Sequence, residues 1–258
     1  MAEYGLKGKT AVITGVGRKK GIGCAIANAL AAEGANIFTT FYTPYDLEQK
    51  YKTNPSDALK IIKALRKKGV RADGMEADLR DPESYARIFD AAEKTAGPVD
   101  ILVNNACICV NADALGITPE LLDDAYKVNL RAAAMLSNEF AKRFKKKTGG
   151  RIILLTSGQG AAPMPDEIPY VLSKAGLDVF ANSASVTLAK KGITINAIDP
   201  GATDTGWMSK GVHAKIKKAN PAGRVGMPED AAKLAVFLAS EQAGWITGQV
   251  IRSNGGGW

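Results

Sequence analysis

Histidine and cysteine are both scarce in this sequence. The 258 residues contain one histidine, His213, and three cysteines, Cys24, Cys107 and Cys109. A metal site needs several ligands at set spacings, and this set offers none, so we expect no metal. A sparse, odd number of cysteines without framework spacing indicates free thiols in a reducing compartment, for which the cytoplasm is the default.

Long apolar runs are also missing. The first apolar run, TAVITG at 10–15, is far too short to span a bilayer, and no apolar stretch precedes it. We therefore expect no signal peptide, no membrane span and no membrane partner.

Acidic residues are fewer than basic ones, 26 against 34, which gives a net charge of +8. Such a surplus suits nucleic acid, an acidic carrier or phosphates, or simply a solvated basic surface. The densest basic run, Lys142 to Lys147, precedes Thr148-Gly149-Gly150, which is typical of a helix end. Cations in a last helical turn are favoured by the helix dipole, which explains the run without a partner. No nucleic-acid-binding motif or aromatic stacking platform accompanies the charge, so we expect no nucleic acid.

Short apolar runs alternate with alanine-rich helical stretches along the whole chain. The runs are nearly continuously apolar, as in strands of a parallel sheet that is covered on both faces. The predicted strands are Thr10–Thr14, Asn36–Tyr42, Val70–Ala77, Asp100–Asn104, Arg151–Thr156, Thr194–Ile198 and Gln249–Arg252. The predicted helices are Gly23–Glu33, Ala58–Lys68, Pro82–Ala96, Pro119–Lys147, Tyr170–Lys191 and Glu229–Leu238.

Four glycines, Gly34, Gly69, Gly97 and Gly192, stand where a helix should end. The alternation predicts right-handed crossovers and one open parallel sheet in an α/β fold, with residues 1–258 forming a single domain. The stretch from Gly201 to Ala222 carries no strand pattern, and a long irregular segment of this kind is typical of a lid.

A glycine-rich turn, TGVGRKKGIG at 14–23, follows the first predicted strand and precedes the first predicted helix. Gly15 can form the tight turn that leaves the strand. Gly21 and Gly23 allow the backbone to approach a phosphate at the helix N-terminus, where free amides favour an anion. This position in the chain indicates a dinucleotide-binding loop.

The second predicted strand, which reads NIFTTFY, lacks the acidic residue that normally holds the ribose hydroxyls of NAD. The nearest acids, Glu33 and Asp46, fall before and after it. Arg18, Lys19 and Lys20 lie within the glycine-rich turn, where cations can bind a 2′-phosphate, although they can also be exposed loop cations. Both observations favour NADP(H).

Tyr170 and Lys174 are spaced i, i+4, so both face the same side of a helix. A free tyrosine has a pKa near 10, and a neighbouring ammonium is expected to lower it, which would make the pair an acid/base unit. Ser157 ends the fifth predicted strand, where a serine is commonly a turn cap. It also lies at the edge of the sheet where ligands bind, so its hydroxyl can orient a substrate oxygen.

Over nearly its full length the sequence resembles the short-chain dehydrogenase/reductase family. The matching features, in chain order, are TGVGRKKGIG, NNA at 104–106, Asn129 in KVNL, Ser157, Tyr170 and Lys174 in YVLSK, Pro200-Gly201 in IDPGAT, and ITGQVIRSNGG. The resemblance implies a Rossmann-type, doubly wound, seven-stranded parallel sheet with helices on both faces. It also implies a homotetramer, as is common in the family, with a dimer as the other possibility.

The resemblance implies a catalytic role for four residues. Tyr170 would be the general acid in reduction and the base in oxidation, and Lys174 would lower its pKa and hold the nicotinamide ribose. Ser157 would orient the carbonyl, and Asn129 would support a water in a proton relay to Lys174. The cofactor-binding residues would be Gly15, Arg18, Lys19, Gly21, Ile22, Gly23, Asp78, Leu79, Asn104, Ala106, Tyr170, Lys174, Pro200, Gly201 and Thr203.

Asp78 would reach the adenine, Asn104 and Ala106 would line the cofactor cleft, and Thr203 would hold the carboxamide end of the nicotinamide. Two departures from the family pattern stand out. Five residues, VGRKK, separate Gly15 from Gly21 where the family has three, so the loop must bulge. Cys107 stands where the family usually has glycine, for which packing is the simple explanation.

The expected function is NADPH-dependent reduction of a small-molecule or carrier-bound carbonyl. Within the family, PAGRVG followed by a helix and ITGQ resembles 3-oxoacyl-[acyl-carrier-protein] reductases, which act in fatty acid biosynthesis. The alternatives are reduction of another ketone, a sugar or a secondary metabolite, and a non-catalytic NADP(H) sensor. Substrate choice is expected to depend on a lid at about 202–222, with Trp207 facing the pocket.

Overall fold

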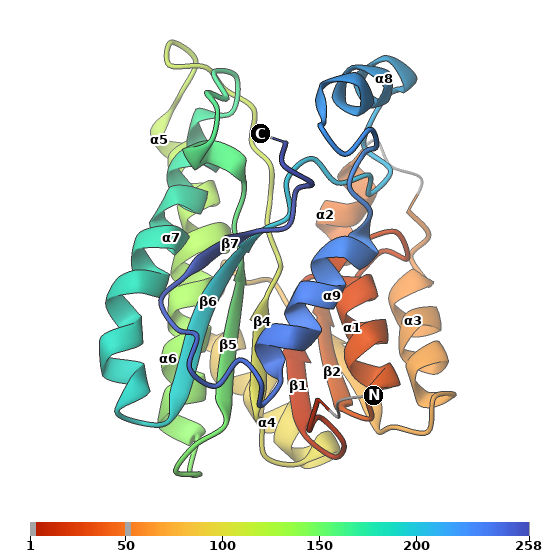
Figure 1. Cartoon of the computed structure of the whole chain (residues 1–258), viewed down its shortest axis with the longest axis vertical. Coiled ribbons are helices and arrows are strands. Elements are labelled where there is room, and N and C mark those ends of the chain that lie inside the picture. Colours follow the sequence, from red (N-terminus) through yellow and green to blue (C-terminus); the bar gives the residue numbers. More distant parts are fainter. Residues whose placement is uncertain (1–3, 50–52, 258) are drawn as a thin grey trace.

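A seven-stranded parallel sheet forms the centre of the molecule (Figure 1). The computed structural model describes residues 4–49 and 53–257. The strands are β1 (Thr10–Ile13), β2 (Asn36–Phe41), β3 (Ala72–Glu76), β4 (Ile101–Asn104), β5 (Gly150–Leu155), β6 (Ile193–Asp199) and β7 (Val250–Arg252). All seven predicted strands are confirmed, with ends that differ by one or two residues.

The helices alternate with these strands along the chain. They are α1 (Ile22–Ala32), α2 (Thr43–Glu48), α3 (Asp57–Arg66), α4 (Glu83–Ala96), α5 (Pro119–Ala125), α6 (Ala132–Arg143), α7 (Ile168–Ala189), α8 (Lys210–Ala219) and α9 (Pro228–Ala239). A π-helical turn, η1 (Tyr126–Arg131), joins α5 to α6, and a short 3-10 turn, η2 (Gly158–Gly160), follows β5. Gly34, Gly69, Gly97 and Gly192 all have positive φ, as expected for glycines that end helices.

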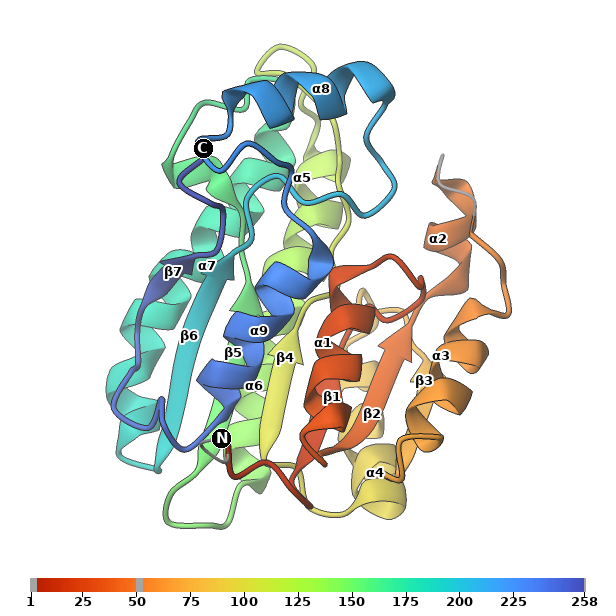
Figure 2. The same ribbon diagram turned by 45° about the vertical axis from the view of Figure 1, so that its right-hand side comes forward.

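Two apolar layers cover the two faces of the sheet, because successive side chains of a buried strand point in opposite directions. In β5, Ile153 and Leu155 join the cluster that includes α1, α3 and α9. Ile152 and Leu154 join the cluster that includes α4, α6 and α7 (Figure 2). This packing explains why the strands read as continuous apolar runs, and it confirms the doubly wound arrangement.

The sheet order is β3-β2-β1-β4-β5-β6-β7, so the direction of winding reverses between β1 and β4. In open α/β sheets a crevice forms at such a reversal, beyond the carboxyl ends of the strands. The glycine-rich turn follows β1 at this edge, and the segment after β6 lies there as well, with α8 beyond the strand ends (Figures 1 and 2). The topology therefore brings the predicted site residues together at one edge.

Three expectations about helices are wrong in detail. The predicted helix Pro119–Lys147 is interrupted by η1 and ends at Arg143, because the next residue, Phe144, turns to extended backbone and is buried. Lys145 to Lys147 therefore lie outside the helix, although the Lys145 ammonium donates to Lys142 O in the last turn at 3.1 Å, as a cation near a helix C-terminus can. The segment 201–222 is not irregular throughout, because it contains α8, whose first turn is capped by the Ser209 side chain. The short helix α2 was not predicted.

Candidate active site

A cavity of about 830 Å³ opens at the carboxyl edge of the sheet. Most of the predicted site residues line it, from six separate segments of the chain. These are Gly15, Arg18, Gly21, Ile22, Asp78, Leu79, Ala106, Ser157, Tyr170, Lys174, Pro200, Gly201 and Thr203. Four predicted residues do not line it, namely Lys19, Gly23, Asn104 and Asn129.

The glycine-rich turn leaves room for a phosphate by keeping side chains out. Gly15 has φ +73°, and a Cβ there would lie 2.6 Å from Ala106 Cα. The first turn of α1 contains no acidic residue, and no side chain caps its N-terminus at Gly21. Because Gly21 and Ile22 line the cavity, the uncapped amides of α1 fit the pyrophosphate of a dinucleotide. Gly23 leaves space for the Asn105 side chain beneath the turn, since a Cβ on it would lie 2.5 Å from Asn105 Nδ2.

Asn105, rather than Asn104, lines the cavity after β4. Its Nδ2 donates hydrogen bonds to Thr14 O at 2.8 Å and to Gly15 O at 3.1 Å, so it holds the glycine-rich turn in place. Asn104 is the last residue of β4, and its side chain is buried, with Nδ2 3.2 Å from Ser137 Oγ. The prediction that Asn104 lines the cofactor cleft is therefore wrong, because strand alternation turns adjacent side chains in opposite directions.

The two loop cations proposed for the 2′-phosphate lie apart. Arg18 lines the cavity, and its Nη1 donates to Thr205 O at 3.0 Å. Lys19 does not line the cavity, because its ammonium forms an ion pair, at 3.2 Å, with the carboxylate of Asp57 at the start of α3. Asp46 also lines the cavity. In the sequence it lies beyond the second predicted strand, but α2 brings it back to the glycine-rich turn, where it pairs with Arg18.

Tyr170, Lys174 and Ser157 meet at the carboxyl end of β5. Tyr170 and Lys174 come from the first two turns of α7, and the Lys174 ammonium lies 5.7 Å from the centroid of the tyrosine ring. Lys174 is 2% exposed, and its Nζ donates to Leu155 O at 2.6 Å. The peptide oxygen thus satisfies part of the hydrogen-bonding capacity of a buried cation.

The pKa of Tyr170 moves in the direction opposite to the sequence-based expectation. Burial of the phenol raises the pKa, the nearby Cys107 and Cys109 thiols and the Glu167 carboxylate add to the rise, and a hydrogen bond with Ser157 opposes it. Desolvation disfavours the charged phenolate, and here it outweighs any effect of the Lys174 ammonium. The phenol is therefore held in its protonated form.

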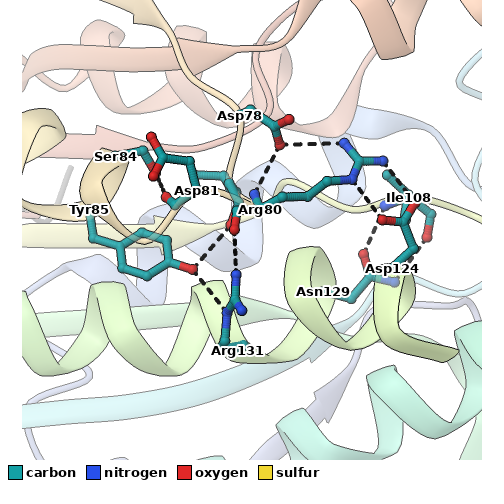
Figure 3. Close-up of polar contacts among 10 residues, drawn as sticks. Asp78, Arg80, Asp81, Ser84, Tyr85, Ile108, Asp124, Asn129 and Arg131 are labelled. Carbon is teal, nitrogen blue, oxygen red and sulfur yellow. Dashed lines mark hydrogen bonds and ion pairs between the residues drawn. The ribbon is translucent and has the colours of Figure 1, made fainter. Parts of the chain in front are cut away.

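Asn129 is buried in η1 and does not line the cavity. Its carboxamide oxygen accepts from Ile108 N at 2.8 Å, and its Nδ2 donates to Ile108 O at 2.9 Å (Figure 3). The same Nδ2 donates to Ser173 Oγ at 3.0 Å. Ile108 belongs to the cavity wall, and Ser173 precedes Lys174. Asn129 thus fixes the wall after β4 against the helix that bears Lys174.

Arg80, which the sequence analysis did not single out, ties the loop after β3 to α5 (Figure 3). Its guanidinium donates to both carboxylate oxygens of Asp124, at 2.8 and 2.9 Å, and lies 3.4 Å from Asp78 Oδ1. Arg131 of η1 donates to Arg80 O, and its Nε lies 3.4 Å from the Tyr85 hydroxyl. The network connects Asp78 at the cavity with the helical segment that carries Asn129.

The chain was compared with known proteins. The family model described as Enoyl-(Acyl carrier protein) reductase matches residues 15–257. The chain is 38% identical to an uncharacterized oxidoreductase, YjdA, of Bacillus subtilis, covering 96% of each chain. It is 34% identical to an L-rhamnose 1-dehydrogenase (NADP(+)) of Thermoplasma acidophilum, covering 97% of this chain and 96% of the relative. It is also 34% identical to the 3-oxoacyl-[acyl-carrier-protein] reductase FabG of Aquifex aeolicus, with 98% and 99% covered.

The chain belongs to the short-chain dehydrogenase/reductase family. Among solved structures, a short-chain dehydrogenase of Burkholderia cenocepacia in complex with NADP superposes with a TM-score of 0.86 at 31% identity, covering 97% of this chain and 98% of the other. This superposition confirms the Rossmann-type fold. Two of the relatives and structures named here carry NADP in their descriptions, in agreement with the cofactor predicted from the sequence.

Both departures from the family pattern are accommodated without strain. Among the residues that the structure describes, only glycines have positive φ, so Cys107 stands in backbone that any residue adopts. The longer loop folds back on itself through a hydrogen bond from Gly21 N to Arg18 O at 3.1 Å. Neither departure therefore places a residue other than glycine at positive φ.

The remaining wall of the cavity differs in character from the cofactor loop. It includes Cys107, Cys109, Met164, Glu167 and Trp207. The indole of Trp207 donates to Thr203 O at 3.0 Å, as expected for a residue at the base of the 202–222 segment that faces the pocket. Burial raises the pKa of Glu167, and the neighbouring carboxylate of Asp166 adds to the rise. Sulfur-containing and aromatic side chains thus form most of this wall, together with one desolvated carboxyl group.

The described residues, 4–49 and 53–257, contain no cluster of three or more His, Cys, Asp or Glu side chains that could hold a metal ion. Within the same residues, no helix has both the length and the apolar composition to cross a membrane.

Proposed function

We propose that this short-chain dehydrogenase/reductase reduces a carbonyl to an alcohol with NADPH, and that Tyr170 supplies the proton. The enzyme is an NADP(H)-dependent oxidoreductase. The observation that carries the proposal is the half-buried phenol of Tyr170, hydrogen-bonded with Ser157, in the same cavity as the uncapped N-terminus of α1.

NADPH supplies the hydride when bound. The Ser157 hydroxyl orients the carbonyl oxygen, and the Tyr170 phenol donates its proton to that oxygen as negative charge develops on it. Lys174 stabilises the resulting phenolate and holds the nicotinamide ribose. Asn129 maintains the position of Lys174 through Ser173 and Ile108, and it supports a proton relay to Lys174.

The raised pKa of Tyr170 gives the two directions of the reaction opposite pH dependence. A phenol that stays protonated through the neutral range is ready to act as an acid, so reduction should decline only at alkaline pH. Oxidation needs the phenolate as a base, so it should rise with pH.

The cofactor residues divide by the part of NADP(H) they suit. Gly15, Gly21 and Ile22 offer backbone amides to the pyrophosphate, and Arg18 offers its guanidinium to the 2′-phosphate. Asp78 and Leu79 suit the adenine. Ala106, Pro200, Gly201 and Thr203 suit the nicotinamide half, together with Tyr170 and Lys174. Gly23 contributes through packing. Lys19 and Asn104 have no direct part, because their side chains are engaged elsewhere.

The first candidate substrate is a 3-oxoacyl thioester, the substrate of a 3-oxoacyl-[acyl-carrier-protein] reductase in fatty acid biosynthesis. Support comes from the 34% identity to FabG and from the charge of the 202–222 segment. No Asp or Glu occurs between Asp204 and Glu229, while α8 carries the exposed Lys210, Lys215, Lys217 and Lys218. We propose that this segment is a substrate lid, on which these cations would attract an acidic carrier.

The second candidate is a carbonyl compound with several hydroxyl groups, such as a sugar. The observation that favours it is Glu167, whose desolvated carboxyl group lines the cavity three residues before Tyr170. A buried carboxyl group needs hydrogen-bond partners, and substrate hydroxyls can provide them. The L-rhamnose dehydrogenase relative supports this alternative.

Oxidation of NADPH against a panel of carbonyl compounds tests the function and separates the candidates. The panel should include acetoacetyl thioesters and simple ketones with NADPH, and aldoses with NADP+, which would oxidise them to lactones in the reverse direction. Turnover of any member with NADPH supports the reductase, and a preference for thioesters over hydroxylated compounds identifies the first candidate. Tight binding of NADPH with no turnover of any carbonyl would instead favour the sensor.

We also propose that the protein is cytoplasmic, because its three cysteines are free thiols, as is typical of a reducing compartment. The exposed face of α7 carries Leu172, Val179 and Val186, which are 57%, 68% and 66% exposed and spaced seven residues apart. An apolar stripe of this kind suits burial against a second copy, within a homotetramer or a dimer.

A further inference from the structure

Arg18 and Asp46 form an ion pair inside the cofactor cavity. Arg18 Nε lies 3.6 Å from Asp46 Oδ1, and the two side chains are only 21% and 16% exposed. Arg18 comes from the glycine-rich turn, whereas Asp46 comes from α2, on the far side of β2 in the sequence. Because both residues line the cavity, the pair differs from an ordinary surface ion pair, which water and salt would weaken.

The carboxylate of Asp46 lies directly against the backbone of the glycine-rich turn. A Cβ built on Gly17 would be 1.9 Å from Asp46 Oδ2, so Gly17 leaves the space that the carboxylate occupies. Burial raises the pKa of Asp46, and the Arg18 guanidinium opposes that rise. The desolvation of Asp46 is thus offset in part by Arg18, and the carboxylate loses this compensation when Arg18 turns to another anion.

Of the three cations of the turn, Arg18 is the one that lines the cavity. Lys19 is paired with Asp57, and Lys20 is exposed and does not line the cavity. A phosphate that binds beside Arg18 therefore enters a place where a carboxylate is already present. Like charges in a partly desolvated site repel each other, so such a phosphate binds less tightly than Arg18 alone would allow.

We propose that Asp46 is a specificity-determining residue that competes with the 2′-phosphate of NADP(H) for Arg18 and so weakens the preference for NADPH over NADH. The proposal rests on the assignment of Arg18 to the 2′-phosphate in the proposed function. NADH lacks that phosphate, so Asp46 has no such effect on it. The carboxylate that pairs with Arg18 thereby reduces the difference in binding affinity between NADPH and NADH.

The test is direct binding of NADPH and NADH to the full chain, measured by calorimetry, so that no substrate is needed. Asp46→Asn keeps the size of the side chain and removes its charge. We expect it to tighten NADPH about tenfold and to change NADH less than about twofold. Glu48→Gln is the matched control, because Glu48 lies on the same helix, lines the cavity and carries the same charge. It should change the NADPH/NADH ratio of dissociation constants by less than about twofold.

The Arg18→Met background separates competition from a general structural effect. In that background Asp46→Asn should no longer tighten NADPH, because the cation for which the two anions compete is gone. The proposal is overturned if Asp46→Asn leaves the NADPH/NADH ratio unchanged, if Glu48→Gln shifts it equally, or if the tightening persists without Arg18. Asp46→Ser carries the same expectation should the asparagine variant fail to fold.

Failure of this proposal is distinguishable from failure of the proposed function. A protein that binds both cofactors with the expected ratios but reduces no carbonyl refutes the reductase and supports the role of Asp46. If Arg18→Met leaves NADPH binding unchanged, the 2′-phosphate lies elsewhere, which overturns the role of Asp46 while the chemistry of Tyr170 stands.

Discussion

Lys174 is the most deeply buried charged residue of the cavity wall, yet its ammonium has an acceptor in Leu155 O. Tyr170, one helical turn earlier, is kept protonated by burial, and Ser157 is the group whose hydrogen bond opposes that effect. The three residues therefore divide the work at the scale of single side chains. In the proposed mechanism, Tyr170 holds the proton, Lys174 carries the compensating charge, and Ser157 adjusts the acidity of the phenol.

Ser157→Ala should lower kcat for reduction by about a hundredfold to a thousandfold, because the carbonyl loses a hydrogen bond that strengthens as charge develops. Without the hydrogen bond that lowers it, the pKa of Tyr170 should rise further. The rise of the oxidation rate with pH should therefore move to higher pH. Rate profiles in both directions check this, and an unchanged profile at wild-type kcat would remove Ser157 from the mechanism.

At the scale of elements, Arg80 joins two parts of the chain that meet at the cavity. It holds Asp124 of α5 through two charge-assisted hydrogen bonds, while its backbone oxygen accepts from Arg131 of η1. These bonds fix the loop after β3, with Asp78, against the helical segment that contains Asn129 (Figure 3). Asp78 at the cavity and the helical segment that carries Asn129 are thus connected by one short network.

Asp124→Asn should lower the free energy of unfolding by about 1 kcal/mol at pH 7, since it breaks a bidentate pair that is partly exposed. Asp123→Asn is the control, because Asp123 makes only an exposed i, i+4 pair with Lys127, and it should cost less than about 0.5 kcal/mol. Urea unfolding measures both.

The Asp124 effect should also depend on pH in a defined direction. Arg80 lowers the pKa of Asp124 in the folded protein, so the pair contributes stability above the ordinary pKa of about 3.9. That contribution is lost as the pH falls through the lowered folded-state value. The difference between wild type and Asp124→Asn should therefore be constant near neutral pH and shrink below about pH 4. A difference that grows on acidification would contradict the pairing.

The elements show what a single sequence can and cannot specify. Buried strands and the glycines that end helices were predictable, because burial on both faces and positive φ leave local patterns. α8 was not, because none of its side chains is fully buried and it therefore carries no core-facing stripe. The end of the long helix at Arg143 depends on the burial of Phe144, which is a tertiary effect.

The site residues follow the same division. Sequence motifs and fixed spacings identified some residues of the cavity, namely Tyr170, Lys174, Ser157 and the glycine-rich turn. Asn104 was assigned to the cleft from the resemblance of NNA to the family pattern, but as the last residue of β4 it turns its side chain into the core, and the next residue, Asn105, lines the cavity. Asp46, Arg80 and Glu167 reach the cavity through the packing of separate elements, for which the sequence has no local pattern.

At the scale of the whole molecule, the sheet is covered on both faces, while the outer face of α7 is left apolar. Val179→Glu should place a charge in the centre of the stripe formed by Leu172, Val179 and Val186, and it should convert the proposed oligomer to smaller species in light scattering after size exclusion. Leu59→Glu is the control, since Leu59 is 63% exposed on α3, away from this stripe. An oligomer that survives Val179→Glu would require a different interface.

The account as a whole depends on the phenol of Tyr170 as the proton donor. Tyr170→Phe removes one oxygen and keeps the ring beside Lys174. With the carbonyl substrate found in the panel, kcat should fall by about a thousandfold or more, while the dissociation constant of NADPH changes less than about threefold. Wild-type turnover in the Tyr170→Phe enzyme would contradict the account.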